Sequence, residues 1–135
     1  MAWKQVSLSP AGVRSASAGA SAVTLPGHLT ELWVVTRLTA SSGPTTLEIL
    51  LESRFDDTNW AENPCKWRLE SQFDGTETAT DLGEALCGNF GAVATGTQMA
   101  YYDNLLSRTV RCHYYIAGTN YNFSVLGYFQ EAVLD

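Results

Sequence analysis

The chain has 135 residues, of which 45% are hydrophobic and only 16% are charged, and its formal net charge is −6. This length suits one domain with a single core that needs no disulfide staples. The acidic balance argues against a nucleic-acid binder, which would present Lys and Arg to phosphates.

The first 28 residues differ in character from the rest of the chain. Residues 3–8 alternate weakly, and residues 15–22 form a run of Ala, Ser and Gly. Such small side chains bury little surface and pack weakly, and a turn signal at 23–27 ends the segment. We therefore expect residues 1–28 to form an extended N-terminal arm, or an edge strand that lies on a neighbour.

Two strands are predicted next. Residues 31–39 alternate between two fairly apolar faces, one with Leu32, Val34, Thr36 and Leu38, the other with Trp33, Val35 and Arg37. Residues 45–54 place Leu47, Ile49 and Leu51 on one face and Glu48 and Glu52 on the other. The sequence Ser-Ser-Gly-Pro at 41–44 predicts a turn between these strands.

The middle of the chain gives weaker signals. Residues 65–73 alternate as a strand, and Asp74-Gly75 predicts a hairpin turn with a return strand over 76–80. Residues 81–87 are compatible with a helical turn, and residues 99–102 with a short strand. The glycines between these two segments argue against a long helix.

The last two predicted strands have the clearest alternation. One face of residues 109–116 carries Val110, Cys112, Tyr114 and Ile116, and residues 121–129 place Tyr121, Phe123, Val125, Gly127 and Phe129 on one face. A turn at 117–120 predicts a hairpin. Many short strands with little helix predict an all-β antiparallel β-sandwich, jelly-roll or Ig-like, with a body over 29–130 in a single domain over 1–135.

The three cysteines do not form a recognisable site. Cys65, Cys87 and Cys112 are odd in number and contain no CxxC pair, which fits neither a disulfide framework nor a zinc site. We expect Cys112 to be a buried thiol, in a protein made in a reducing cytosol. The N-terminus has no apolar run of a signal peptide, and no stretch approaches a membrane span, so we expect no membrane partner.

No residue pattern indicates catalysis. The histidines, His28 and His113, lie far apart and in no metal-ligand spacing. Cys112 and His113 are adjacent on a strand and point to opposite faces, so they cannot form a nucleophile pair. A carboxylate pair of the glycosidase type stays open, but nothing singles one out. We expect no enzyme activity, no catalytic residue, no metal and no cofactor.

The segment 53–60, Ser-Arg-Phe-Asp-Asp-Thr-Asn-Trp, is the most distinctive motif. Asp56, Asp57 and Asn59 form a polar turn that Trp60 closes. An EF-hand would need a Gly and a twelfth-position Glu that are absent, so a calcium site is the less favoured interpretation. Asp and Asn in turns usually bond their own backbone, so we expect a structural turn made by Asp56, Asp57, Asn59 and Trp60.

This motif resembles the S-x-D-G-T-N-W turn of small β-sandwich virion proteins from tailed bacteriophages. The segment Arg111 to Val125 resembles their closing hairpin, Arg-x-x-Tyr-x-x-Gly-Thr-x-x-x-Phe-x-Val, and Ser42 to Thr45 fits the Ser-Gly-Pro-Thr that precedes the first strand. The resemblance covers about residues 30–129. The chain departs from the pattern where Asp57 replaces the turn Gly, a position that tolerates Asp.

The resemblance implies a head decoration (cement) protein that stabilises the capsid by bridging its subunits, located in the virion after synthesis in the host cytoplasm. A neck, tail or head-fibre component is the alternative within the virion. The implied partners are the major capsid protein or other virion proteins, and a homo-oligomer, with a trimer favoured because capsids offer three-fold sites. The candidate interface comprises Trp3, Val6, Leu8, Arg111, His113 and Tyr115.

A second resemblance points to discoidin-like carbohydrate-binding modules, which carry a Ser-x-Asp-x-x-x-Trp turn on a jelly roll. This hypothesis uses Trp60, Trp67 and exposed tyrosines as stacking platforms, with Asp56 and Asn59 as hydrogen-bond partners. The ten Trp and Tyr residues exceed what one small core needs, and outward aromatic rings often mark protein or sugar contacts.

Overall fold

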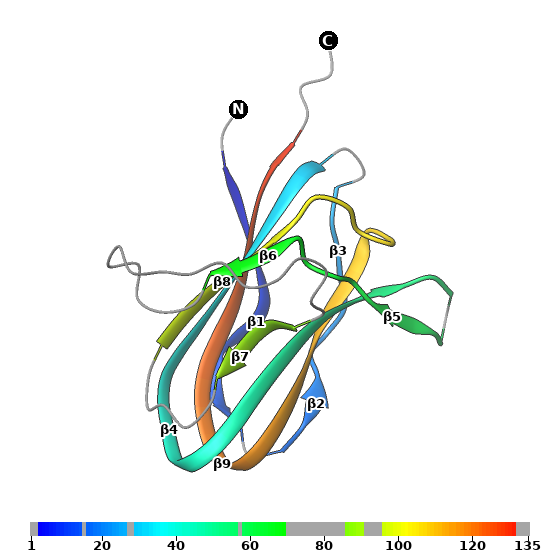
Figure 1. Cartoon of the computed structure of the whole chain (residues 1–135). Helices are drawn as coiled ribbons and strands as arrows, with labels where there is room; N and C mark the ends of the chain where they lie inside the picture. Colours follow the sequence, from blue (N-terminus) through cyan, green and yellow to red (C-terminus); the bar gives the residue numbers. More distant parts are fainter. Residues whose placement is uncertain are drawn as a thin grey trace.

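Two long strands, β4 (Leu29–Arg54) and β9 (Thr109–Glu131), run antiparallel and side by side through the fold (Figure 1). The structure is a computed structural model that describes residues 3–14, 16–26, 29–56, 58–69, 86–90 and 96–131. The shorter strands are β1 (Lys4–Arg14), β2 (Ala18–Gly19), β3 (Val23–Thr24), β5 (Trp60–Glu62), β6 (Trp67–Leu69), β7 (Leu86–Phe90) and β8 (Gly96–Tyr102). The predicted all-β class is confirmed.

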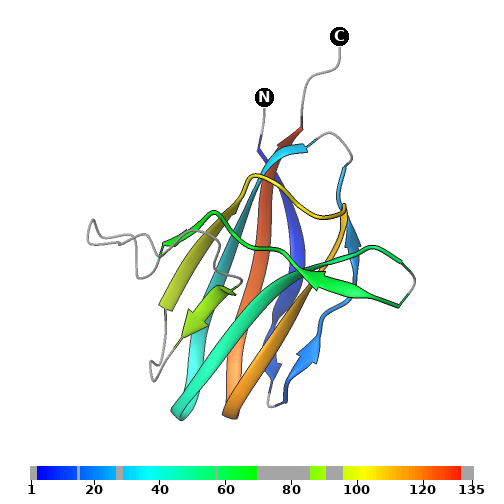
Figure 2. The same ribbon diagram turned by 45° about the vertical axis from the view of Figure 1, so that its right-hand side comes forward.

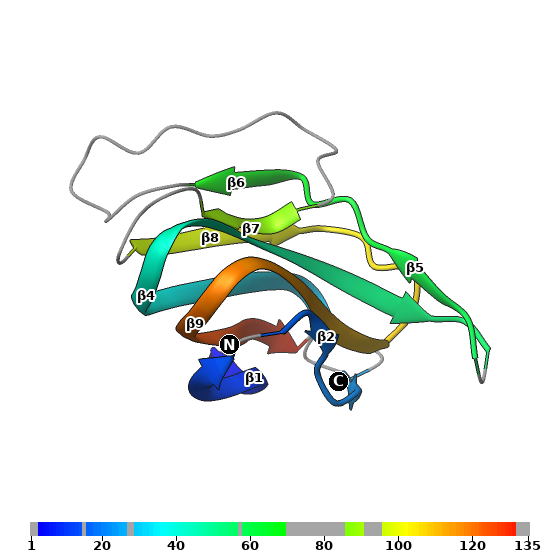
Figure 3. The same cartoon turned by 90° about the horizontal axis from the view of Figure 1, so that it is seen from below.

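The two long strands bend together and so contribute to both layers of a sandwich (Figures 2 and 3). In layer one, residues 29–39 of β4 and 121–131 of β9 lie in the order β1-β9-β4-β8-β6. In layer two, residues 47–54 of β4 and 109–116 of β9 pair with β7, β5, β2 and β3. The predicted antiparallel β-sandwich is therefore confirmed.

The bend lies where the sequence predicts two turns, and both long strands reverse direction there, but the predicted hairpin between 109–116 and 121–129 is wrong. Ser42 of β4 pairs with Thr119 of β9, and the ladder passes through this region with several register shifts. Figure 1 shows β4 and β9 each running down one layer, reversing at this bend and returning in the other layer, and the two halves of β9 each pair with β4 instead of with each other. Gly and Pro inside strands mark bulges and sharp bends, and here they let two paired strands change layer together.

The core lies between the layers and follows the predicted alternation. Its buried side chains from the two long strands are Leu32, Val34, Leu38, Leu47, Ile49, Leu51, Val110, Cys112, Tyr114, Tyr121, Phe123, Val125 and Phe129. Thr36 is also fully buried. The period of two in the sequence therefore places the correct face of each long strand inward.

The described N-terminal residues, 3–14 and 16–26, contribute β1, β2 and β3 to the sandwich, so of the two expectations for residues 1–28 the structure has an edge strand and not an extended arm. Strand β1 pairs with β9 from Lys4 opposite Phe129 to Arg14 opposite Tyr121, with register shifts on both sides of Ser9. It forms an edge of layer one. The side chain of Leu8 is only 2% exposed and belongs to the core, so burial of apolar surface holds β1 in place.

The side chain of Arg14 forms hydrogen bonds that hold the irregular C-terminal part of β1 against β9. Its Nη1 donates to the carbonyl of Phe123 at 2.8 Å, and its Nη2 donates to Ser9 Oγ at 2.7 Å and to the Pro10 carbonyl. The guanidinium also lies over the Phe123 ring, with Cζ 4.3 Å from the centroid. These contacts satisfy backbone groups that the register shifts leave outside the ladder.

The middle of the chain agrees in part with the sequence. The predicted strand over 99–102 is confirmed within β8, and the predicted strand over 65–73 is described only as β6. The predicted helical turn over 81–87 is wrong at its end, because Leu86 begins strand β7. The predicted hairpin at Asp74-Gly75, and its return strand over 76–80, lie outside the described residues.

Candidate functional site

A row of aromatic side chains crosses the outer face of layer one. Tyr128 of β9 is paired with Trp33 of β4, Trp33 with Tyr101 of β8, and Tyr101 with Trp67 of β6. Because paired residues on one side of a sheet are neighbours, the four rings form one row. The ring centroids of Trp33 lie 4.9 Å from Tyr101 and 5.0 Å from Trp67, and none of the four residues is fully buried.

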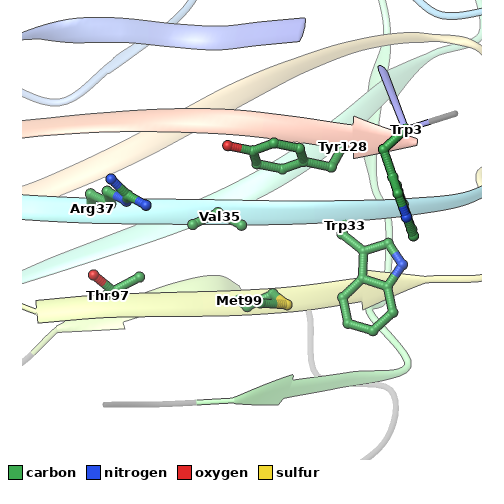
Figure 4. Close-up of a pocket in the computed structure, with 7 residues that line it drawn as sticks. All are labelled: Trp3, Trp33, Val35, Arg37, Thr97, Met99 and Tyr128. Atoms are coloured by element: carbon green, nitrogen blue, oxygen red, sulfur yellow. The ribbon is translucent and has the colours of Figure 1, made fainter. Parts of the chain in front are cut away.

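Trp3 stands at one end of this row. Its side chain is 51% exposed, and its ring meets Trp33 edge to face at 6.3 Å. An open groove of about 740 Å³ begins at these rings and runs along the strands (Figure 4). The lining residues are Trp3, Trp33, Val35, Arg37, Thr97, Met99 and Tyr128.

The groove becomes more polar along its length. Behind the aromatic row, Val35 pairs with Met99, and in the next outward-facing row Arg37 pairs with Thr97. Figure 4 shows the Arg37 and Thr97 side chains at the opposite end of the groove from the two indoles. Trp33 Nε1 donates to Glu31 Oε2 at 3.2 Å, which fixes the orientation of the indole. The groove therefore offers an aromatic end, an apolar floor and a polar end.

A second patch lies on the outer face of layer two and includes three predicted interface residues. Glu52 Oε1 accepts from Arg111 Nε at 2.9 Å and lies 3.4 Å from His113 Nδ1. The imidazole of His113 stacks on the ring of Tyr115 at 4.7 Å, and Arg111 Cζ lies 4.2 Å from the Trp60 ring centroid. We call Glu52, Trp60, Arg111, His113 and Tyr115 the layer-two patch.

Tyr115 is the most exposed member of the layer-two patch, at 43%. A hollow of about 420 Å³ adjoins it and is lined by Glu48, Leu50, Glu62, Leu86 and Tyr115. The patch thus combines an exposed aromatic ring, a stacked guanidinium and a neighbouring depression. Tyr, Trp and Arg in such settings are the residue types that dominate protein interfaces.

The Asp56 turn is closed by its own hydrogen bonds. Asp56 Oδ1 accepts from the backbone N–H of Thr58 at 2.8 Å and of Asn59 at 2.7 Å, and Oδ2 accepts from Asn59 Nδ2 at 2.6 Å. The bond from the Asn59 side chain, with those from the two backbone groups, lowers the pKa of Asp56 below its usual value. Both carboxylate oxygens are thus used within the turn. Asp57 lies outside the described residues.

The structure separates the six predicted interface residues. Arg111, His113 and Tyr115 lie together in the layer-two patch, and Trp3 lies on the outer face of layer one. Leu8 is in the core and Val6 is partly buried against it, so neither presents the surface that an interface needs. The sequence placed these two residues on an arm, whereas the structure places them in β1 against the core.

The residues of the predicted sugar site do not come together. Trp67 packs against Trp33 and Tyr101 in layer one, whereas Trp60 belongs to β5 in layer two and lies under Arg111. The carboxylate of Asp56 is occupied by its own turn. Trp60 and Trp67 therefore cannot form one stacking platform.

The three thiols all lie in the core. Cys65, Cys87 and Cys112 are buried thiols that take part in no disulfide among the described residues, and burial is as expected for Cys112. Burial raises the pKa of the Cys87 thiol to about 12 and that of Cys112 well above its usual range. Among the described residues, no group of three or more His, Cys, Asp and Glu side chains is placed to hold a metal ion.

The groove on layer one was not predicted from the sequence. The alternation of residues 31–39 places Trp33, Val35 and Arg37 on one face of a strand, but no pattern marks them as a site. The sequence pattern that could have indicated the groove is an aromatic residue, an apolar residue and a cation at alternate positions of one strand. The other face of this strand is also apolar and forms the core. Their combination with Met99, Thr97 and Tyr128 depends on strand pairing, which the alternation does not specify.

Comparisons with known proteins do not assign the chain to a family. No protein-family profile matches the chain, and a search of curated proteins finds no significant match. A solved crystal structure of the SPBc2 prophage-derived protein YomS is similar, with a TM-score of 0.46 and 14% sequence identity over 95% of this chain and 92% of that one. The search for helices able to span a membrane finds none in the described part of the chain.

Proposed function

We propose that this chain is a non-enzymatic structural protein of a bacteriophage virion, and that it decorates the capsid and bridges its subunits. The virion class comes from the sequence resemblance of the 53–60 turn and the 111–125 segment. The layer-two patch carries the proposal of a protein contact, because its exposed Tyr115 stacks on His113 beside a hollow.

The chemistry of the patch suits a protein partner. Interfaces are enriched in aromatic residues and Arg at their centres and have polar rims. Tyr115 and Trp60 supply ring surface, and Glu52 accepts a hydrogen bond from Arg111, which also lies over the Trp60 ring and is therefore held in position. A preformed patch loses little side-chain entropy on binding, which favours affinity.

The sandwich suits decoration because its two outer faces point in opposite directions. A capsid subunit that binds the layer-two patch leaves the outer face of layer one directed away from the shell. Many copies on one shell raise its stability by mass action, since they bind the assembled state only. We propose a homo-oligomer, with a trimer favoured at three-fold sites of the capsid.

Binding to empty capsids tests this function. Capsids of the source phage, prepared without this chain, are mixed with purified protein, and co-sedimentation and capsid melting are measured. We expect saturable binding and a higher capsid melting temperature, with binding by Tyr115→Ala and Arg111→Ala weakened about tenfold or more. Phe55→Ala is the control, because Phe55 is an exposed aromatic residue, 63% exposed, outside the patch.

Two outcomes contradict the decoration role, and a third rejects only its contact surface. A stable monomer in light scattering that fails to bind empty capsids removes it. If electron microscopy locates the chain on the neck, tail or head fibre, the chain is still a virion protein, but it does not decorate the capsid. Binding that is unchanged in Tyr115→Ala and Arg111→Ala rejects the layer-two patch as the contact surface.

A further inference from the structure

We infer that the groove on the outer face of layer one binds an oligosaccharide. This site differs from the sugar site expected from the sequence, because it uses Trp3, Trp33 and Tyr128 and does not use Trp60. It also lies on the opposite outer face from the layer-two patch, so it does not depend on the capsid contact.

The dimensions of the groove suit an extended ligand. Its volume of about 740 Å³ falls within the range of ligand sites. From the Trp33 row to the Arg37 row, β4 advances four residues, or about 13 Å at the usual rise of a strand. This length accommodates a chain of several rings better than a single small molecule.

Because the groove is open to solvent, it suits an amphipathic ligand. An apolar small molecule needs an enclosed site that removes most of its surface from water. This groove is open to solvent, so a ligand that lies in it keeps one side wet. A sugar ring meets both conditions, because its C–H face packs on an aromatic ring while its hydroxyl groups stay hydrated.

The polar end supplies hydrogen-bond donors for hydroxyl groups. Arg37 is exposed, and no described residue forms an ion pair or hydrogen bond with its guanidinium. The Thr97 hydroxyl likewise has no hydrogen-bond partner among the described residues. Within the described part of the chain, a ligand can therefore contact both groups without displacing an internal partner, and a guanidinium can donate to two neighbouring hydroxyls.

Charge argues against a nucleic acid as the occupant, although bases also stack on aromatic rings. Single-stranded nucleic acid is bound in positively charged grooves that follow the backbone. Among the described residues that line this groove, Arg37 is the one cation, in a chain with a net charge of −6. A proline-rich peptide is the remaining ligand that fits an aromatic-lined groove, and the experiment below includes it.

The test uses the full chain and defined probes. Purified protein is screened on a printed array of bacterial surface polysaccharides together with chitohexaose and cellohexaose, and any hit is measured by titration calorimetry. We expect specific binding that Trp3→Ala and Tyr128→Ala weaken at least tenfold and that Arg37→Gln weakens less. Trp3 is 51% exposed and precedes β1, so its removal leaves the core intact.

The matched control is Trp60→Ala, which removes an indole on layer two and leaves the groove unchanged. Circular dichroism and melting temperature confirm that each variant is folded. The inference is overturned if no probe binds, if binding is unchanged in the Trp3 and Tyr128 variants, or if Trp60→Ala abolishes it. Binding of decaproline without any glycan also overturns it.

Discussion

Val6 of β1 and Gly127 of β9 are paired across the edge of layer one, and a Cβ atom added at Gly127 would lie 3.1 Å from Val6 Cγ1. The same atom would lie 3.3 Å from the side chains of Leu8 and Leu32. The missing side chain at Gly127 thus makes room for apolar groups from β1 and β4. This contact is where the N-terminal strand joins the core.

Replacement of Gly127 by Val should therefore destabilise the protein. The added methyl groups overfill a packed site, which costs about 1–3 kcal/mol in the free energy of unfolding. Urea denaturation followed by tryptophan fluorescence measures this change. Gly12→Val is the control, because nothing lies within 4 Å of a Cβ atom at Gly12. Equal stability of the two variants would contradict the packing described.

Truncation of Leu8 tests whether β1 belongs to the folded domain in solution. Leu8 is 2% exposed, and removal of a buried leucine side chain to Ala costs about 2–5 kcal/mol. Val13→Ala on the same strand should change stability by less than about 0.5 kcal/mol, because Val13 is 65% exposed. A free arm would give two small effects, and thermal unfolding of both variants distinguishes these cases.

Alternation predicted which face of each long strand is buried, because a half-buried strand has a period of two whatever its partner. It did not predict which strands pair. The segments 41–44 and 117–120 contain Gly, and one contains Pro, which favour the chain reversals that both long strands make there. In the fold these segments lie opposite each other, with Ser42 paired with Thr119, and the ladder between β4 and β9 carries both strands through a bend.

The residues of the candidate sites were likewise only partly predictable from the sequence, because strand pairing brings some of them together. Arg111, His113 and Tyr115 share a face of one strand, so their grouping was predictable from sequence. Glu52 and Trp60 join them through pairing of β4 with β9 and with β5, which local pattern does not encode. The extended-arm alternative rested on the weak packing of the Ala, Ser and Gly run, whereas backbone pairing of Ala18 and Gly19 with β9 places part of this run in the sandwich.

The three thiols should be unreactive in the folded protein. Thiolate is the reactive species, and burial raises the pKa of Cys87 to about 12 and that of Cys112 well above its usual range. We expect little labelling by iodoacetamide at pH 8 in the native state and labelling of all three cysteines in 6 M guanidinium, measured by mass spectrometry. Rapid labelling of Cys112 under native conditions would show that the core opens locally.

The stacking of Arg111 on Trp60 should contribute measurably to stability. A double-mutant cycle with Trp60→Leu and Arg111→Met isolates this contact, and we expect a coupling of about 0.5–1 kcal/mol in chemical denaturation. The matched cycle uses Arg54→Met, because Arg54 Cζ lies 5.8 Å from the Trp60 ring centroid compared with 4.2 Å for Arg111. A larger coupling for Arg54 would contradict the assigned partner.

The Asp56 turn should make stability depend on pH in the acid range. Its hydrogen bonds hold the pKa of the folded carboxylate below the usual value of 3.8, so the ionised form is favoured in the native state. A lowered folded pKa gives stability that is fully present above the unfolded pKa and is lost as pH falls through the folded pKa. The contribution should therefore be intact at pH 7 and should decline below about pH 4.

The variant Asp56→Ala isolates this contribution from that of the other carboxylates. We expect it to melt at a lower temperature than the native chain at pH 7, with a difference that narrows at pH 3. Thr58→Ala is the control, because it removes only the long 3.4 Å bond from the hydroxyl and keeps both backbone donors, so its pH profile should follow that of the native chain. A melting difference for Asp56→Ala that is equal at both pH values would show that the turn does not depend on the charge of Asp56.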